Sequence, residues 1–566
     1  MGTGKPSGRD VLARSIKQQG RRVTLSALLG AAHQLGEVSV PVLIGVVIDR
    51  AVTRSDGGLL VLWLGVLAVV YVALSWSFRL GARAGERAAE EAAHDLRVAL
   101  VRRVLDSRGG AETGRLPGEL ANIATEDAKR VGAVIMALTS GIWACAGVAA
   151  SAVALLLISL PLGLIVLLGT PALLYAGHLL SKPLERRSEA EQDRAAHASG
   201  VAADLVAGLR VLKGIGAQRA AVERYRRTSR DSLAATLRAA RAESWQTGLV
   251  IALTGGFLTL IALVGGRLAL SGDITLGQLV SAVALALFLL GPLEVFAWVN
   301  AELAQGRASA ARVAEVLAAE PAVASGDAAP TAPVRGAVRL RGVRLEGLDG
   351  LDLELPAGEL TGVAVTDPAD ARALLRCLGR DADPEAGHVE LDGVPLTSLD
   401  PALLRTAILV SAHDAALFEG SLAENVTPLA DSGDPEETQR FMAAACADEV
   451  ARSLPYGDAT DVGEGGRSLS GGQRQRVLLA RALRAGREVL VVHDPTTAVD
   501  AVTEARIAEG IREVRGGRTT VLVTNSPALL AVTDRVVLLD RGRVGAQGTH
   551  AELVRDDAAY RTAVLA

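Results

Sequence analysis

The sequence predicts a multidomain membrane protein, in which a six-helix all-α transmembrane domain is followed by an α/β domain. Half of the 566 residues are hydrophobic and the mean hydropathy is +0.31, which is typical of a membrane protein with a large soluble part. Six apolar segments each approach the ~20 residues that cross a bilayer as a helix. After residue 330 or so, short Val- and Leu-rich strands alternate with helices.

The first 22 residues form a basic flank, with Lys or Arg at positions 5, 9, 14, 17, 21 and 22. A long apolar stretch follows without a small-residue cleavage site, so we expect a retained cytoplasmic segment and not a signal peptide. An Ala-, Pro- and Gly-rich run later marks a linker. We therefore expect a basic segment at 1–22, a transmembrane domain with two cytoplasmic extensions at 23–319, a linker at 320–336 and the α/β domain at 337–566.

The six apolar segments are unevenly spaced, at 23–48, 59–80, 133–158, 161–180, 247–270 and 276–299. Two long polar stretches, 81–130 and 181–245, lie between the second and third and between the fourth and fifth segments; both are expected to be helical. The other connections are short and carry little charge. The positive-inside rule then places both long stretches and both termini in the cytoplasm of a protein of the cell membrane.

The cysteines carry no chemistry of their own. Cys145, Cys377 and Cys446 lie far apart and lack metal-ligand spacing, so the sequence supports neither a disulfide framework nor a zinc site. We expect a cytoplasmic location for the soluble part, no metal held by the protein alone and no nucleic-acid partner.

A phosphate-binding loop is expected after the first buried strand of the α/β domain, at 360–366. Such a loop needs glycines that let backbone N–H groups wrap the phosphates, a Lys for the β- and γ-phosphates, and a Ser or Thr hydroxyl for Mg²⁺. Here the turn is about two residues too short and places Asp367 and Asp370 where a polyanion would bind. Arg372 could replace the Lys only weakly, and it is more simply a solvated helix residue.

Five motifs then follow one another: V-S-A-H-D-A-A-L-F-E-G-S-L-A-E-N-V (Val410–Val426), T-D-V-G-E-G-G (Thr460–Gly466), L-S-G-G-Q (Leu469–Gln473), H-D-P-T-T-A-V-D (His493–Asp500) and G-R-V-G-A-Q-G-T-H-A-E-L (Gly542–Leu553). Their order resembles the nucleotide-binding domain of an ABC transporter, and the second motif resembles a loop of the exporter branch. The six helices with two extensions resemble the exporter-type membrane domain. The resemblance covers nearly the whole chain and implies an exporter-type half-transporter with an ABC-type nucleotide-binding domain.

The resemblance also shows where this chain departs from the family. His493 stands at the position of the Asp that binds Mg²⁺ after the Walker B strand, and Asp494 at that of the catalytic Glu. His413 replaces the Gln that senses Mg²⁺ and water. Asn525 replaces the switch His, and the adenine-stacking aromatic is replaced near Gly347. Together with the lost phosphate loop, these changes predict that the chain's own ATPase site is inactive.

The signature motif is intact, which points to a heterodimer. In the family each ATP lies between the phosphate loop of one domain and the signature of the other, so the signature and the D-loop would contact a partner's nucleotide through Leu469, Ser470, Gly471, Gly472, Gln473 and Asp500. The partner would be a second half-transporter with complete Walker A and Walker B motifs and a switch His, and would hold most of the ATP and Mg²⁺. The weaker interpretation is that the motif is an uneroded remnant or a simple helix cap.

Two segments resemble the coupling segments of exporters: Gly118–Asp127, with Glu126 and Asp127, and Asp204–Lys213, with Asp204 and Arg210. The alternative is that they are exposed amphipathic helices, which the context of the other motifs disfavours. Ionisable groups also lie deep in the apolar segments, namely His33, Glu37 and Glu294. They either line a path for a cationic or amphipathic cargo or make polar contacts between helices.

The sequence therefore predicts the degenerate half of a heterodimeric ATP-driven exporter, with membrane lipid around it and a peptide, a lipid-like molecule or another amphipath as cargo. Two alternatives remain. The first is a transport-dead membrane scaffold or sensor that has kept the ABC fold, and the second is an importer that uses the exporter-type fold.

Overall fold

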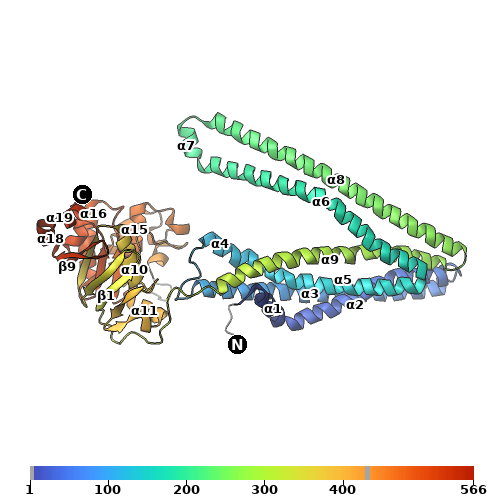
Figure 1. Ribbon diagram of the computed structural model, residues 1–566, viewed down its shortest axis with the longest axis horizontal. Coiled ribbons are helices and arrows are strands. Elements are labelled where there is room, and N and C mark those ends of the chain that lie inside the picture. The colour runs from blue at the N-terminus through green and yellow to red at the C-terminus, as the bar shows by residue number, and fades with distance from the viewer. Residues whose placement is uncertain (1–5, 428–433, 566) are drawn as a thin grey trace. The chain divides into compact units, whose positions relative to one another are not determined.

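The computed structural model describes residues 6–427 and 434–565 of the chain (Figure 1). It divides into two compact units. The first unit comprises the chain up to Val101 together with Leu116–Ala318. The second unit comprises Arg102–Arg115 and Ala319–Ala566. The segment 102–115, which the sequence analysis assigned to the membrane domain, thus belongs to the second unit.

The first unit is helical throughout. Its α-helices are α1 (Gly8–Gln18), α2 (Gly20–Val47), α3 (Gly57–Val104), α4 (Pro117–Asn122), α5 (Ala128–Ile158), α6 (Leu160–Ala207), α7 (Leu209–Gly214), α8 (Gln218–Leu270) and α9 (Leu276–Leu317), with π-helical turns η1 (Ile48–Val52) and η2 (Ile123–Asp127). All six predicted apolar segments lie in helices. The prediction of an all-α membrane domain is confirmed.

Among the described residues, five helical segments are long and apolar enough to cross a membrane, namely Gly57–Val104, Pro117–Ile158, Leu160–Gly177, Gln218–Leu270 and Leu276–Leu317. The predicted first segment, 23–48, forms α2 but is not one of these five. The polar side chains of His33, Gln34 and Glu37 interrupt its apolar sequence.

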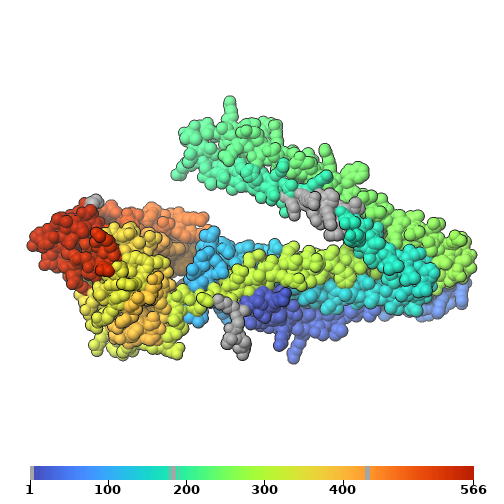
Figure 2. Space-filling view, in the orientation of Figure 1, coloured from blue at the N-terminus to red at the C-terminus, as the bar shows by residue number. Residues whose placement is uncertain are grey.

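The long helices continue far beyond the apolar segments. The 48 residues of α3 and the 53 of α8 correspond to roughly 70–80 Å of helix, more than twice the ~30 Å of a bilayer's hydrocarbon core. The polar stretches 81–130 and 181–245 are therefore largely extensions of these same helices. Helices α6 and α8 run side by side and are joined through α7 (Figure 1), and the side chains of α8 are largely exposed along this arm (Figure 2).

Small residues allow close packing between the helices of the bundle. A Cβ atom on Gly132 of α5 would lie 2.4 Å from the Ala89 carbonyl oxygen of α3. A Cβ atom on Gly30 would lie 1.7 Å from Nε1 of Trp143, so only glycine at this position of α2 leaves room for the indole ring. Such small residues are what membrane helices use to bring their backbones together.

The second unit is an α/β domain, as the sequence predicted, and it contains two sheets. Its strands are β1 (Val338–Leu345), β2 (Leu348–Leu355), β3 (Leu360–Val365), β4 (Ala386–Leu391), β5 (Val394–Pro395), β6 (Ile408–Ser411), β7 (Val489–His493), β8 (Thr520–Val523), β9 (Arg535–Asp540) and β10 (Arg543–Gly548). The order in the larger sheet is β10-β9-β3-β8-β7-β6, and in the smaller antiparallel sheet it is β2-β1-β4-β5.

The helices of the second unit are α10 (Pro368–Leu378), α11 (Pro401–Ala407), α12 (Leu422–Val426), α13 (Pro435–Ala444), α14 (Ala447–Ser453), α15 (Gly471–Arg484), α16 (Ala501–Arg515), α17 (Pro527–Ala531), α18 (His550–Asp556) and α19 (Ala558–Leu565). Strand β3 lies inside the larger sheet and all six of its residues are buried. Strands β9, β3, β8, β7 and β6 are parallel, so their carboxyl ends meet at one edge of the sheet.

Candidate functional site

The carboxyl edge of the larger sheet brings together the residues that the sequence analysis assigned to the chain's own nucleotide site. Thr366 and Asp367 follow β3, and Asp494 follows β7. Asn525 lies two residues after β8, and His413 lies two residues after β6. Ligands of open parallel sheets bind at this edge. The fold therefore places these residues at the expected site, and their contacts decide what the site can bind.

Two carboxyl groups at the phosphate-loop position accept hydrogen bonds from backbone N–H groups, one at the start of α10 and one in the β9–β10 turn. Only two residues separate β3 from α10, and Asp367 caps the helix by accepting a 2.8 Å hydrogen bond from the Ala369 N–H. Asp370 is buried, and its Oδ2 accepts a 2.8 Å hydrogen bond from the Gly542 N–H. Burial raises the pKa of Asp370 above its usual range. Arg372 is exposed.

Asn525, at the switch position, is fully engaged with the backbone. Its Oδ1 accepts a 2.9 Å hydrogen bond from the Val365 N–H, and its Nδ2 donates a 2.9 Å hydrogen bond to the Val365 carbonyl oxygen. Both polar atoms of the side chain are thus bonded to the last residue of β3. This arrangement fixes Asn525 where a switch His would need to reach a nucleotide.

The two histidines of the site contact each other. Nδ1 of His413 lies 3.2 Å from Nδ1 of His493, and the rings meet edge to face. Nε2 of His493 lies 3.5 Å from Oδ2 of Asp494. Burial lowers the pKa of His493 below its usual range. A cavity of about 10 Å³ beside both rings is at the lower limit for one water molecule.

Gly347 closes the same region from the β1–β2 turn. Its φ is +120°, and a Cβ atom there would lie 3.2 Å from Oδ1 of Asp370. An aromatic side chain at this position would be strained and would crowd a buried carboxylate. The glycine at position 347 therefore leaves the space that the buried carboxyl group of Asp370 needs.

These residues do not fit a magnesium triphosphate. Hard Mg²⁺ favours oxygen ligands, but His493 offers nitrogen where the family has a carboxylate. The helix N-terminus that would bind an anion is capped by Asp367, and Asp370 adds a second carboxyl group. These elements would form this chain's own part of a composite ATP site, called the half-site below. Hydrogen bonds within the protein close this half-site.

The signature motif has the opposite character. Ser470 is exposed and is the N-cap of the 14-residue helix α15, where Ser470 and Gln473 form a reciprocal capping box. Leu469 is buried and anchors the turn, whereas Gly471 is exposed. A Cβ atom on Gly472 would lie 2.4 Å from the Ala498 carbonyl oxygen, so this close approach requires glycine.

Asp500 in the D-loop is exposed and caps α16 by accepting a 3.0 Å hydrogen bond from the Thr503 N–H. This bond holds the pKa of Asp500 below its usual range.

The signature presents a small hydroxyl, a glycine and the positive end of a helix dipole to the surface, which is the chemistry that recognises a phosphate.

The four residues proposed for coupling lie in different environments. Glu126, Asp204 and Arg210 are exposed. Asp127 is buried within the first unit, where its carboxylate accepts hydrogen bonds of 2.9 Å from Ser309 Oγ and 2.7 Å from Arg312 Nε. Docking through the carboxylate of Asp127 would require this ion pair to break, so its observed role is to join η2 to α9.

The segment 102–115, which the sequence pattern placed in the membrane domain, is bonded within the second unit. Nη1 of Arg405 donates a 2.8 Å hydrogen bond to the Ser107 carbonyl oxygen, and Nη2 of Arg103 donates one of 2.8 Å to the Ala319 carbonyl oxygen. The Ala322 N–H donates a 3.0 Å hydrogen bond to the Arg108 carbonyl oxygen. Because backbone carbonyls are the acceptors, residue types gave no signal for this contact.

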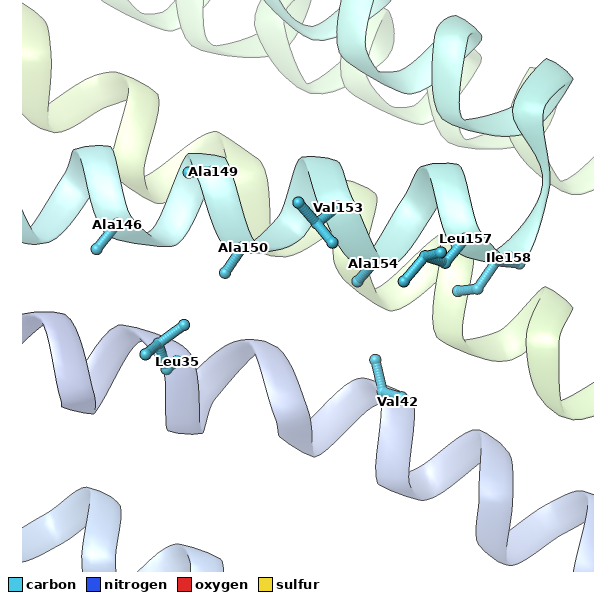
Figure 3. Close-up of a pocket in the computed structure, with 9 residues that line it drawn as sticks. All are labelled: Leu35, Val42, Ala146, Ala149, Ala150, Val153, Ala154, Leu157 and Ile158. Carbon is cyan, nitrogen blue, oxygen red and sulfur yellow. The ribbon is translucent and has the colours of Figure 1, made fainter.

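Three hollows between described helices of the first unit bear on its function. A groove of about 700 Å³ between α2 and α5 is lined only by aliphatic side chains (Figure 3): Leu35, Val42, Ala146, Ala149, Ala150, Val153, Ala154, Leu157 and Ile158. A cavity of about 350 Å³ between α6, α8 and α9 includes Glu294. A third cavity, of about 370 Å³ between α2, α5 and α9, includes Glu37. His33 is buried on α2 beside Glu37.

Comparison with known families agrees with the two units. Residues 23–293 match the ABC transporter transmembrane region, and residues 348–497 match the ABC transporter family, whose domains bind ATP with Mg²⁺. The described structure has the same succession of helical and sheet-containing parts.

Three relatives illustrate the similarity. The chain is 28% identical over 95% of its length to a mitochondrial potassium channel ATP-binding subunit of Pongo abelii, covering 77% of that protein. It is 31% identical over 94% of its length to a multidrug efflux ATP-binding/permease protein of Mycobacterium tuberculosis, covering 46% of it. It is 28% identical over 84% of its length to an ATP-dependent lipid A-core flippase of Xylella fastidiosa, covering 82%. The chain belongs to the ABC transporter family and is a multi-pass, exporter-type half-transporter, with a membrane domain fused to a nucleotide-binding domain.

Proposed function

We propose that this chain is the degenerate half of a heterodimeric ATP-driven exporter, in which it donates its signature to the ATP site of a catalytic partner. The contrast between the two halves of its nucleotide chemistry supports this proposal. Asp367, Asp370 and Asn525 are engaged in hydrogen bonds to the protein's own backbone, whereas Ser470 and Gly471 are exposed at a helix N-terminus. A scaffold without ATP chemistry has no use for that exposed helix end.

A homodimer of this chain would hydrolyse no ATP. Two copies of this chain would pair two closed half-sites with two open signatures, and no composite site would have a phosphate loop. A partner with a complete Walker A, Walker B and switch His would restore one site. ATP and Mg²⁺ would then be held mainly by the partner, and the second composite site would be inactive.

The transported molecule is an amphipath in this proposal. The related proteins are named for multidrug efflux and for a lipid A-core flippase, and these names are consistent with cargo that has both polar and apolar parts. The nucleotide-binding domain and both termini lie in the cytoplasm. The exposed Asp204 and Arg210 at the α6–α7 junction contribute to coupling with the partner.

The chain alone is expected to show no saturable ATP binding even in the millimolar range, because Asp367 caps the helix N-terminus where phosphates would bind and Asp370 places a second carboxyl group beside it. Fluorescence of trinitrophenyl-ATP, displaced by excess ATP and Mg²⁺, measures this on the purified full chain in lipid nanodiscs. The heterodimer is the positive control and should show displaceable fluorescence. Displaceable binding to the chain alone would contradict the closed half-site. A heterodimer that binds ATP but neither hydrolyses it nor transports cargo would favour a scaffold or sensor.

A further inference from the structure

The half-site that does not fit a magnesium triphosphate contains a pair of histidines at the carboxyl edge of the larger sheet. His413 lies in the turn after β6, and His493 is the last residue of β7. Their Nδ1 atoms are 3.2 Å apart, the ring planes are inclined at 86°, and the ring centroids are 4.9 Å apart. Two rings joined in line through these nitrogens would have their centroids farther apart, so the contact is bent. A metal ion bound by two rings also lies beside the line between their nitrogens and not on it.

The separation of the two nitrogens is that of two ligands on one metal ion. Nitrogen ligands about 2.0–2.1 Å from a tetrahedral zinc ion lie roughly 3.3–3.4 Å apart. Imidazole suits Zn²⁺, Cu²⁺ and Ni²⁺, whereas Mg²⁺ favours oxygen ligands. The pair that makes the half-site unsuitable for Mg²⁺ thus has the spacing and the ligand type that a transition-metal ion needs.

Asp494 favours the tautomer of His493 that can bind a metal through Nδ1. Oδ2 of Asp494 lies 3.5 Å from Nε2 of His493, so the carboxylate favours the proton on Nε2 and leaves the lone pair on Nδ1. A carboxylate behind the far nitrogen orients most metal-binding histidines in this way. Burial also lowers the pKa of His493, which favours the neutral ring that a metal requires.

His413 can adopt the matching tautomer at little cost. Its side chain is exposed, so its Nε2 can carry the proton in water while Nδ1 presents a lone pair. Within residues 6–427 and 434–565, no group of three or more His, Cys, Asp and Glu side chains forms a closed metal site. The histidine pair is therefore an open site of two protein ligands. The cavity of about 10 Å³ beside both rings is large enough for one water molecule as a further ligand.

We propose that His413 and His493 bind a divalent transition-metal ion of the zinc class through their Nδ1 atoms, without nucleotide, and that water completes the coordination. The ion joins the turn after β6 to the end of β7. Sequence spacing does not indicate this site, because the two histidines are 80 positions apart. The inference does not depend on the heterodimer, since both ligands belong to this chain.

Isothermal titration of Zn²⁺ into the untagged full chain in lipid nanodiscs, without nucleotide, tests the proposal. We expect saturable binding that weakens at least tenfold in His413→Gln and in His493→Gln, and that millimolar Mg²⁺ does not displace. His388→Gln is the matched control and should bind like the unchanged chain. Nε2 of His388 also faces a carboxylate, 3.0 Å from Oε1 of Glu390, but His388 belongs to no histidine pair in the described part of the chain. Pulsed electron paramagnetic resonance of bound Cu²⁺ should show two imidazole ligands in the unchanged chain and one in each single variant.

Absence of saturable Zn²⁺ binding by the unchanged chain would overturn the proposal. Equal binding by the unchanged chain and His413→Gln would also overturn it, because His413 is exposed and its replacement leaves the core of the domain intact. Equal weakening in His388→Gln would show general binding to histidines and no specific site. Failure to bind Zn²⁺ would leave the proposed heterodimer in place, and failure of ATP turnover by the heterodimer would leave the metal site in place.

Discussion

Substitution Ser470→Arg is expected to abolish ATP turnover by the complex of this chain with its catalytic partner. Ser470 is exposed at the start of α15, where a small hydroxyl and the helix dipole can approach the γ-phosphate of a nucleotide bound to the partner. An arginine side chain would fill this space. Loss of such a preorganised contact costs about 10²-fold or more in turnover. The measurement is phosphate release by the purified heterodimer in lipid.

Two controls separate this effect from damage to the fold. Asp494→Asn should leave turnover nearly unchanged, because Asp494 belongs to the closed half-site and has a φ of +43°, which Asn tolerates well. Thr549→Arg removes an equivalent exposed capping box at α18 and matches the ~1 kcal/mol that the lost cap of α15 would cost. Equal losses from Ser470→Arg and Asp494→Asn would contradict the division of labour between the subunits.

Arg380→Met is expected to be the most destabilising of the substitutions considered for the nucleotide-binding domain. The guanidinium is almost fully buried and donates hydrogen bonds of 2.7 Å to the Leu399 carbonyl oxygen, 2.6 Å to that of Ala324 and 3.1 Å to Oδ1 of Asp383. These hydrogen bonds connect the segment that follows α9 with the loop that follows β5. Methionine fills a similar volume but removes the donor from all three acceptors, of which the Leu399 carbonyl is buried, at a cost of about 3–5 kcal/mol.

Differential scanning calorimetry of the full chain measures this loss as a fall of roughly 10 °C in the transition of the nucleotide-binding domain. Arg372→Met is the matched control, since Arg372 is exposed on α10 and its replacement should stay within about 0.5 kcal/mol. If Arg380→Met had the same transition temperature as the control, the hydrogen bonds of the buried guanidinium would not stabilise the domain.

Local sequence patterns predicted the parts of the fold that local physics decides. The apolar run 360–366 became the buried strand β3, and the Asp367-Pro368 pair started α10, because Asp caps a helix and Pro is tolerated in its first turn. The strand Thr520–Val523 appeared with the predicted bounds. The absence of a phosphate loop could be predicted for the same reason, since the length and residue types of a loop are local properties of the sequence.

Contacts between distant residues could not be read in this way. Asp127 was assigned to coupling from its motif, but it pairs with Arg312, 185 positions away. The bonds that close the half-site join Asn525 to Val365 and Asp370 to Gly542, 160 and 172 positions apart. The attachment of the segment 102–115 to the second unit depends on backbone carbonyls, which every residue has. Only the packed structure brings these groups together.

ATP turnover by this chain purified alone, and then co-purified with a half-transporter that has complete motifs, tests the central claim most directly. The heterodimer account predicts no turnover by the chain alone and turnover by the pair that Ser470→Arg removes. Turnover by the chain alone would contradict the account, because it would mean that Asp494 and Arg372 still support hydrolysis in a site closed by the protein's own hydrogen bonds.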